Sequence, residues 1–271
     1  MNEVVNRSPL RGKATLVTGA ARGLGAEIAA ALAAAGARVL IGDVRLDLAK
    51  STAARIRESA GEAHAIHHDV ASEASWQSAA QAMSDSYGAF DILVNNAGVE
   101  KVALFTQTTL AQLQQLHDVN VAGVFLGIKH AALAMRPGGA AGRGGVIVNV
   151  SSVAGLIGMP GLGGYCASKA AVRLMTKAAA LEFAALDYGI RVNSIHPAIV
   201  KTDMGAKVVN GMAAIGLAPD EASADAYVQS LHPSGYGRPQ DVAEGVLFLA
   251  SDASRWSNGS ELVLDGGVTA R

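Results

Sequence analysis

The sequence predicts an α/β fold with a single Rossmann-type domain, in which helices cover both faces of a doubly wound parallel sheet. Short β-branched apolar runs alternate with alanine-rich helical segments along the 271 residues. A glycine-rich turn, "TGAARGLG" at 18–25, joins the first predicted strand directly to the first predicted helix. Alternating strands and helices imply right-handed crossovers, and such crossovers build a parallel sheet.

The predicted strands are short apolar runs bounded by polar residues, glycine or proline. The first, "ATLVTG" at 14–19, is largely apolar and ends in glycine, which is typical of a buried strand. The others lie at 37–43, 63–70, 90–98, 144–152, 190–197 and 260–267.

The predicted helices lie between these strands, and several carry recognisable end signals. In segment 23–36, Ile28 and Leu32 stand at helical spacing and a glycine provides the C-terminal stop. Ser72 is a suitable cap for a helix over 72–88, and Pro239 stands near the start of a helix over 238–251. The remaining helices are predicted at 44–60, 108–136 and 164–187.

Residues 12–271 therefore form one predicted domain, without a linker or an internal repeat. Residues 1–11 are expected to be a disordered N-terminal arm. Residues 203–236 break the rhythm with small helical pieces, several glycines and two prolines. This stretch is too long for an ordinary connection, so we expect it to be an insertion that forms a substrate loop or lid.

Composition excludes several classes of function. Half of the residues are hydrophobic, 17% are charged and the formal net charge is −1, so nucleic acid is not expected as a partner. No run of ~20 uninterrupted apolar residues and no signal-peptide pattern occur, which argues against a membrane span. The single cysteine, Cys166, forbids a disulfide within the chain and fits a reducing cytoplasm.

The glycine-rich turn predicts a phosphate-binding loop. Gly19 permits the tight turn, Gly23 lets a pyrophosphate approach the backbone, and Gly25 allows the helix to pack closely on the strand. The following helix offers unpaired N–H groups and the positive end of its dipole to phosphates. The spacing G-x-x-x-G-x-G differs from the commoner G-x-G-x-x-G, and a plain glycine-rich turn is the alternative interpretation.

Asp43 ends the second predicted strand, where a carboxylate can accept hydrogen bonds from both ribose hydroxyls of an adenosine. The same carboxylate would repel a 2′-phosphate, so NAD is favoured over NADP. Arg22, inside the loop, is an opposing signal because its guanidinium could contact that phosphate. A helix N-cap is the alternative role for Asp43.

On these residues the chain resembles the short-chain dehydrogenase/reductase family over about residues 12–268. The family's signatures occur in order: "TGAARGLG" (18–25), "NNAG" (95–98), "HDVNVAG" (117–123), "NVSS" (149–152), "YCASK" (165–169), "HPAIVKT" (196–202) and "LVLDGG" (262–267). One position departs from the pattern, since Ala198 stands where the family commonly has glycine. A homotetramer is expected from the same resemblance.

The resemblance implies a role for each matching position. Tyr165 matches the catalytic tyrosine, Lys169 its lysine, Ser152 the serine thirteen residues before the tyrosine, and Asn120 a fourth catalytic residue. The resemblance extends to the cofactor. The residues expected to bind it, in addition to Tyr165 and Lys169, are Gly19, Arg22, Gly23, Leu24, Gly25, Asp43, Val44, Asp69, Val70, Asn96, Ala97, Gly98, Pro197, Ile199 and Thr202.

The chemistry of alcohol oxidation explains why these residue types would be needed. A cofactor takes the hydride, and a protein base must take the hydroxyl proton. A free tyrosine has a pKa near ~10, and the ammonium of Lys169 is expected to lower the pKa of Tyr165. Ser152 can donate to the substrate oxygen, and Asn120 can order a water that carries the proton away. No metal is expected, and we predict that His64, His67 and His68 are strand-face or surface residues.

Apolar residues on two segments are expected to bind the substrate. They are Val153, Leu156, Ile157, Met159 and Leu162 near the predicted tyrosine, and Met204, Val208, Met212 and Leu217 in the insertion. They favour a hydrophobic secondary alcohol or ketone, ring-containing or steroid-like. The alternatives are a 3-oxoacyl-carrier-protein reductase that uses NADPH, and a dinucleotide-sensing protein without enzymatic activity.

Overall fold

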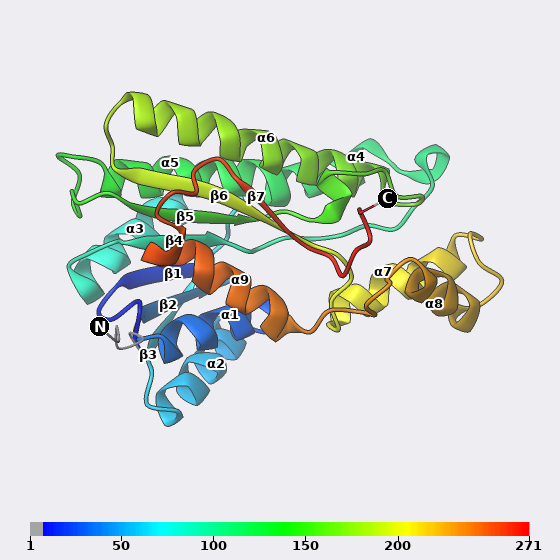
Figure 1. Ribbon diagram of the computed structural model, residues 1–271, viewed down its shortest axis with the longest axis horizontal. Helices are drawn as coiled ribbons and strands as arrows, with labels where there is room; N and C mark the ends of the chain where they lie inside the picture. Colours follow the sequence, from blue (N-terminus) through cyan, green and yellow to red (C-terminus); the bar gives the residue numbers. More distant parts are fainter. Residues whose placement is uncertain (1–7, 271) are drawn as a thin grey trace, which may run out of the picture.

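A computed structural model describes residues 8–270 and contains one seven-stranded parallel sheet (Figure 1). The spatial order of the strands is β3-β2-β1-β4-β5-β6-β7. Their bounds are β1 (Ala14–Thr18), β2 (Arg38–Asp43), β3 (Glu62–His67), β4 (Ile92–Asn95), β5 (Gly145–Val150), β6 (Ile190–Pro197) and β7 (Glu261–Leu264). The order changes direction between β1 and β4, and ligands bind at such a switch point outside the carboxyl ends of the strands.

Helices cover both faces of this sheet, which confirms the predicted fold class (Figure 1). One face carries α1 (Gly23–Ala34), α2 (Leu46–Glu58) and α9 (Pro239–Ala250). The other carries α3 (Glu73–Tyr87), α5 (Gly123–Met135) and α6 (Gly163–Ala185), with α4 (Leu110–His117) leading into α5. Two helices, α7 (Asp203–Ala214) and α8 (Glu221–Ser230), lie beyond the carboxyl end of the sheet.

The central strands β1, β2, β4, β5 and β6 contribute side chains to two hydrophobic cores, one on either face. Val17, Val39 and Ile41 belong to the core under α1 and α9. Leu16 and Leu93 belong to the core under α3, α5 and α6. Because both faces are buried, the strands are largely apolar along their whole length rather than alternating.

The predicted helix over 108–136 is three segments in the structure. A π-helical turn at Asp118–Ala122 separates α4 from α5, and Asn120 lies in this turn. Hydrophobic periodicity does not show such a turn, because one residue inserted into a helix leaves the apolar pattern on either side intact. Turns of this kind are frequent at functional sites.

The prediction of a disordered N-terminal arm is wrong for residues 8–11. Residues 1–7 lie outside the described residues, but residues 8–11 form a turn on the end of α1. Leu10 is buried, and its backbone N–H donates to the Ala35 oxygen at 3.0 Å. A single apolar residue such as Leu10 in a polar segment produces no periodic pattern. Its burial follows from contact with the end of α1, which the sequence does not show.

The run Leu110–Met135, which comprises α4, the π-helical turn and α5, is the one stretch within residues 8–270 long and apolar enough to cross a membrane. Half of its most apolar window is buried inside the fold. Val124, Ile128 and Met135 pack in the core under α5. We therefore assign the apolar character of this run to the core of the domain.

The 203–236 insertion forms α7 and α8, which pack on each other around a small core of their own. This core contains Val209, Met212, Ala224 and Val228. The hydroxyl of Thr202 caps α7 and the carboxylate of Asp220 caps α8. The insertion is thus an ordered helical pair beside the carboxyl ends of β5 and β6.

Candidate active site

A cleft of about 780 Å³ opens at the carboxyl ends of the strands. Its walls bring together residues far apart in the sequence, from the glycine-rich loop to α8. All of the expected cofactor-binding residues line it: Gly19, Arg22, Gly23, Leu24, Gly25, Asp43, Val44, Asp69, Val70, Asn96, Ala97, Gly98, Tyr165, Lys169, Pro197, Ile199 and Thr202. Ser152 lines it as well, whereas Asn120 does not.

The glycine-rich loop owes its shape to close contacts that side chains would prevent. A Cβ on Gly19 would lie 2.6 Å from the Ala97 Cα, and one on Gly25 would lie 2.4 Å from the Asn96 Nδ2. Gly23 has φ of +57°, and nothing lies within 4 Å of the place where its Cβ would be. No side chain caps the first turn of α1, so its N–H groups remain available to a phosphate.

Three side chains hold this loop from behind. Asn96 donates to the backbone oxygens of Thr18 at 2.9 Å and Gly19 at 3.1 Å. Thr52 donates to the Ala21 oxygen at 2.8 Å. Asp43 accepts from the Ala21 N–H at 3.0 Å. The loop is therefore ordered by the fold itself.

Asp43 is not the N-cap of α2, a position that Arg45 occupies, but its carboxylate orders the backbone that leads into this helix. Its other carboxylate oxygen accepts from the Arg45 N–H at 2.9 Å, just before α2, so it fixes the entry into that helix. It also lies in the wall of the cleft at the end of β2, where an adenosine ribose would bind. Arg22 forms an ion pair with Asp203 of α7, which links the glycine-rich loop to the insertion.

Lys169 and Tyr165 stand one turn apart on α6, and burial dominates both side chains. The Lys169 ammonium donates to the Val150 oxygen at 2.8 Å and lies 5.7 Å from the centre of the Tyr165 ring. Burial lowers the pKa of Lys169 to about 8. Burial raises the pKa of Tyr165 to about 12, and the nearby Glu100 carboxylate adds to this rise.

The expected lowering of the Tyr165 pKa by Lys169 is therefore not found in this structure. The ammonium is directed at a backbone carbonyl, and removing the phenol from water disfavours its charged form. A hydrogen bond with Ser152 acts in the opposite direction and lowers the pKa of Tyr165. The four-residue spacing predicts that the two side chains lie one turn apart on a helix. It does not show that both are buried, or that burial disfavours their charged forms.

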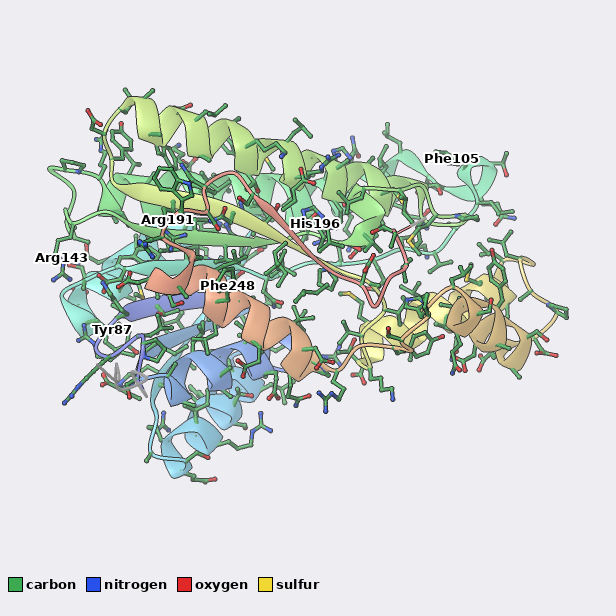
Figure 2. All side chains as sticks on the ribbon, in the orientation of Figure 1. Tyr87, Phe105, Arg143, Arg191, His196 and Phe248 are labelled. Carbon is green, nitrogen blue, oxygen red and sulfur yellow. The ribbon has the colours of Figure 1, made fainter. Side chains whose placement is uncertain are left out.

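Ser152 is positioned by a buried histidine of β6. His196 donates through Nδ1 to the Ser152 backbone oxygen at 3.0 Å, and its Nε2 lies 2.9 Å from the Ser194 hydroxyl. Figure 2 shows His196 on β6, deep in the domain. The side chain of Ser152 accepts from the Ala154 N–H at 3.1 Å and lies 3.4 Å from the Pro197 oxygen.

Asn120 acts on the backbone behind the cleft. Its Oδ1 accepts from the Val99 N–H at 2.9 Å, and its Nδ2 donates to the Val99 oxygen at 2.9 Å and to Ser168 at 3.0 Å. Both amide hydrogens are used, and the side chain is fully buried. Asn120 is therefore a positioning residue in this structure, and the role expected for it in ordering a water stays a prediction.

The substrate end of the cleft is mainly apolar, as expected, but its walls differ in detail. Leu156 and Leu217 do not line it, whereas the other expected residues do: Val153, Ile157, Met159, Leu162, Met204, Val208 and Met212. Sequence reasoning missed Glu100, Lys201, Lys207, Tyr227, Leu231 and His232. His232 of the insertion accepts from the Ile199 N–H at 3.3 Å, a contact that no local pattern indicates.

Within residues 8–270, no three His, Cys, Asp or Glu side chains gather as metal ligands would. His64 and His67 on β3 are exposed. His68 is buried, packs edge-on against Trp76, and lies 3.1 Å from the Ser75 hydroxyl.

Comparison with known proteins agrees with this geometry. A family model described as "Enoyl-(Acyl carrier protein) reductase" matches residues 19–269. A crystal structure of a short-chain type dehydrogenase/reductase from Mycobacterium marinum superposes with a TM-score of 0.88 at 35% identity, covering 99% of this chain and 100% of that one. The chain belongs to the short-chain dehydrogenase/reductase family. It is thus an oxidoreductase with a nicotinamide dinucleotide cofactor.

Three curated relatives in this family are similar over almost their whole length. A cyclopentanol dehydrogenase from Comamonas testosteroni is 40% identical, covering 95% of this chain and 97% of the relative. A 3-alpha-(or 20-beta)-hydroxysteroid dehydrogenase from Mycobacterium tuberculosis is 39% identical, with coverage of 96% and 91%. An NADP-dependent (R)-specific alcohol dehydrogenase from Lentilactobacillus kefiri is 35% identical, with coverage of 97% and 98%.

The residues present fit a dinucleotide. The bare backbone at Gly23 and the uncapped start of α1 suit a pyrophosphate, and Asp43 suits a ribose. Lys169, buried beside Tyr165 with one hydrogen bond to protein, retains two N–H groups for further acceptors such as ribose hydroxyls.

Burial of Lys169 predicts a specific pH dependence of stability. Below pH ~8 the ammonium is charged in both the folded and unfolded chain, and folding bears the full cost of burying it. Between about 8 and its ordinary value of 10.5 the folded protein loses this proton first, so stability rises with pH. Lys169→Met removes this cost. The free energy of unfolding of the variant minus that of wild type should therefore be larger at pH 7 than at pH 10.5, by up to ~3 kcal/mol.

Urea unfolding of the wild type and the variant at these two pH values measures this difference. Lys207→Met is the control, because Lys207 lines the same cleft but is exposed. If the free energy of unfolding changed with pH equally in wild type and Lys169→Met, burial would not disfavour the charged form of Lys169.

Proposed function

We propose that this chain is an NAD(H)-dependent dehydrogenase that interconverts a hydrophobic secondary alcohol and its ketone. The observation that carries the proposal is the placement of Ser152, Tyr165 and Lys169 at one end of a cleft whose other end is formed by the glycine-rich loop and Asp43. The three side chains can accept the hydroxyl proton of a secondary alcohol and return it to a ketone oxygen. The rest of the cleft suits a dinucleotide.

The side chains suggest how the proton would be handled. The nicotinamide of the cofactor supplies the hydride acceptor or donor. The Tyr165 hydroxyl gives its proton to the substrate oxygen in reduction and takes it back in oxidation. Ser152 would donate to the same oxygen, and its hydrogen bond with Tyr165 favours the phenolate. Lys169 would hold the ribose hydroxyls of the cofactor through the two N–H groups that have no acceptor within residues 8–270.

The apolar walls support a hydrophobic substrate, and the relatives support a cyclic one. The apolar lining comes from two segments, with Ile157, Met159 and Leu162 before Tyr165 and Met204, Val208 and Met212 in the insertion. The names of two relatives refer to cyclopentanol and to hydroxysteroids, which are both ring alcohols. A ring-containing secondary alcohol or ketone is therefore the substrate class that we propose. We further propose that the enzyme works in the cytoplasm.

The alternative enzyme, a 3-oxoacyl-carrier-protein reductase, has one observation in its favour. The matching family model carries an acyl-carrier-protein reductase description. Asp43 at the ribose position and the absence of a basic cluster in the sequence argue against it. A dinucleotide sensor is a poorer explanation, because it would not need Ser152, Tyr165 and Lys169 in one cleft.

Replacing the proposed proton donor tests the reaction. Tyr165→Phe should lower kcat for a cyclic ketone such as cyclopentanone by about 10²- to 10⁴-fold, because only the hydroxyl is lost. Stopped-assay or absorbance kinetics at 340 nm measure this with NADH and with NADPH. Tyr87→Phe, on α3 and outside the cleft, is the matched control. Activity of Tyr165→Phe close to that of wild type would exclude the proposed acid/base role.

Replacing Asp43 tests the proposed cofactor preference. Wild type should have a higher kcat/KM with NADH than with NADPH, and Asp43→Ala should reduce or reverse this ratio, since a carboxylate repels a 2′-phosphate. Because Asp43 also orders the loop through Ala21, Asp43→Asn is the companion variant that keeps the shape of the side chain. A wild-type preference for NADPH would contradict the proposal and favour the carrier-protein reductase.

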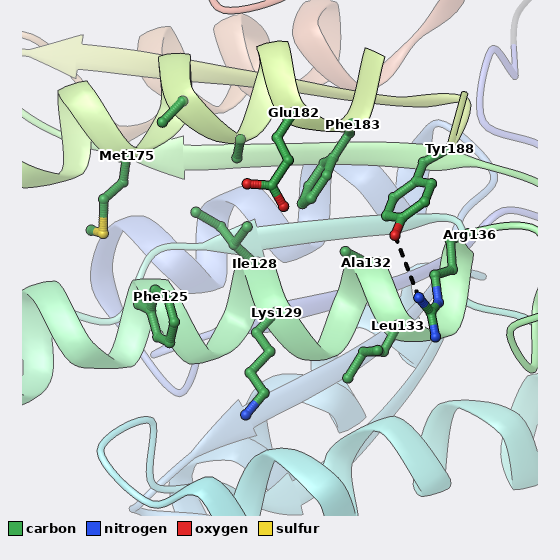
Figure 3. Close-up of a pocket in the computed structure, with 12 residues that line it drawn as sticks. Phe125, Ile128, Lys129, Ala132, Leu133, Arg136, Met175, Glu182, Phe183 and Tyr188 are labelled. Atoms are coloured by element: carbon green, nitrogen blue, oxygen red, sulfur yellow. Dashed lines mark hydrogen bonds between the residues drawn. The ribbon is translucent and has the colours of Figure 1, made fainter. Parts of the chain in front are cut away.

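We also propose a homo-oligomer, with a tetramer expected from the family. Figure 3 shows a groove between α5 and α6 that is lined by Phe125 and Leu133 of one helix and Met175 and Phe183 of the other. Phe125 and the neighbouring Leu181 are 55% and 74% exposed. Apolar surface of this kind favours a partner, and a second copy of the chain is the partner proposed.

Light scattering coupled to gel filtration tests this assembly. We expect a tetramer for wild type and a smaller species for Phe125→Arg, because the variant places a charge in the apolar groove. Leu48→Arg, on exposed α2, should leave the mass unchanged. A wild-type protein that elutes as a monomer at micromolar concentration would refute the proposal.

A further inference from the structure

One charged residue interrupts the apolar end of the cleft. Glu100 directly follows "NNAGV", is half-buried, and lines the cleft together with Ser152 and Tyr165. Its carboxylate is near enough to Tyr165 to influence the phenol electrostatically. Within residues 8–270 it has neither a hydrogen bond nor an ion pair.

The backbone on both sides of Glu100 is held in place. Asn120 bonds both the N–H and the carbonyl of Val99, each at 2.9 Å. On the other side, the N–H of Ala103 donates to the Gly161 oxygen at 2.8 Å. The chain therefore restricts the carboxylate to this part of the cleft, and only its own side-chain rotations can move it.

An apolar substrate would make this carboxylate costly. As the substrate fills the cleft it displaces water, and a carboxylate that loses water needs a hydrogen-bond donor in exchange. Within residues 8–270 no protein group forms a hydrogen bond with this carboxylate, so a donor on the substrate would replace the lost water. A site built in this way rejects a ligand that lacks the donor, because binding then leaves a charged group unpaired.

We infer that Glu100 is a specificity-determining residue that accepts a hydrogen bond from a second polar group of the substrate. The preferred substrate would then be a cyclic alcohol or ketone that carries an additional hydroxyl or ammonium group, rather than a purely apolar one. This inference rests on the proposed function and narrows its substrate class.

A matched substrate series tests the inference. The series is cyclohexanol, the 1,2-, 1,3- and 1,4-cyclohexanediols, and 4-aminocyclohexanol, with kcat/KM measured at saturating cofactor. We expect wild type to prefer at least one donor-bearing compound over cyclohexanol by about tenfold or more. Glu100→Leu should bring this ratio close to one, mainly by weakening the donor-bearing substrate and not cyclohexanol.

A second variant separates the two kinds of donor and controls for folding. Glu100→Gln keeps the shape and one acceptor oxygen but not the charge. It should retain part of a preference for a diol and lose a preference for the amino alcohol. Because the Glu100 charge also affects Tyr165, the full pH profile of each variant is recorded and the ratios are compared at each plateau.

The outcomes distinguish this inference from the proposed function. The inference alone is overturned if wild type oxidises cyclohexanol and the donor-bearing compounds with similar kcat/KM. It is also overturned if wild type prefers a donor-bearing compound and Glu100→Leu keeps that preference. If neither NAD nor NADP supports oxidation of any compound in the series, or reduction of the corresponding ketones, the proposed function fails and this inference fails with it.

Discussion

The site depends on the tight contact between the segment that follows β4 and the glycine-rich loop that follows β1. These two parallel strands are neighbours at the switch point, so their carboxyl ends meet. Backbone from both strands approaches too closely for any Cβ at Gly19 or Gly25, and Asn96 fixes the contact with two hydrogen bonds. A side chain at either glycine would separate the first turn of α1 from the sheet.

The same segment organises the catalytic end of the cleft. Where Gly98 would carry a Cβ, the nearest atoms belong to Asn120 and Lys169. Val99 is held by Asn120, and Ala103 is held by Gly161 in the loop before α6. The segment 96–103 after β4 therefore contacts the glycine-rich loop, the π-helical turn and the loop that precedes Tyr165. Hydrogen bonds to backbone groups thus connect the glycine-rich loop with the loop before α6, and the polar side chains of Asn96 and Asn120 make most of them.

Burial sets the electrostatic character of the catalytic pair. Lys169 is almost fully buried and donates to a backbone carbonyl, and its pKa falls to about 8. Tyr165 has its pKa raised to about 12 by the same loss of water. In the protein alone, burial therefore favours the neutral phenol of Tyr165 over the phenolate. Coulombic attraction between neighbours on a helix is a weaker effect here than desolvation.

The sequence by itself determined the α/β class and the helices with clear end signals such as Ser72 and Pro239, because periodicity and end signals depend on neighbours a few positions apart. The family resemblance added a set of expected cofactor-binding residues, all of which line the cleft. Only the tertiary structure decided that Asn120 lies in a π-helical turn behind the cleft, that Leu10 is buried, and that His196 holds Ser152. It also brought Glu100 and His232 into the walls of the cleft and raised the Tyr165 pKa. Burial and contacts between distant strands control these features, and no pattern along the chain records either of them.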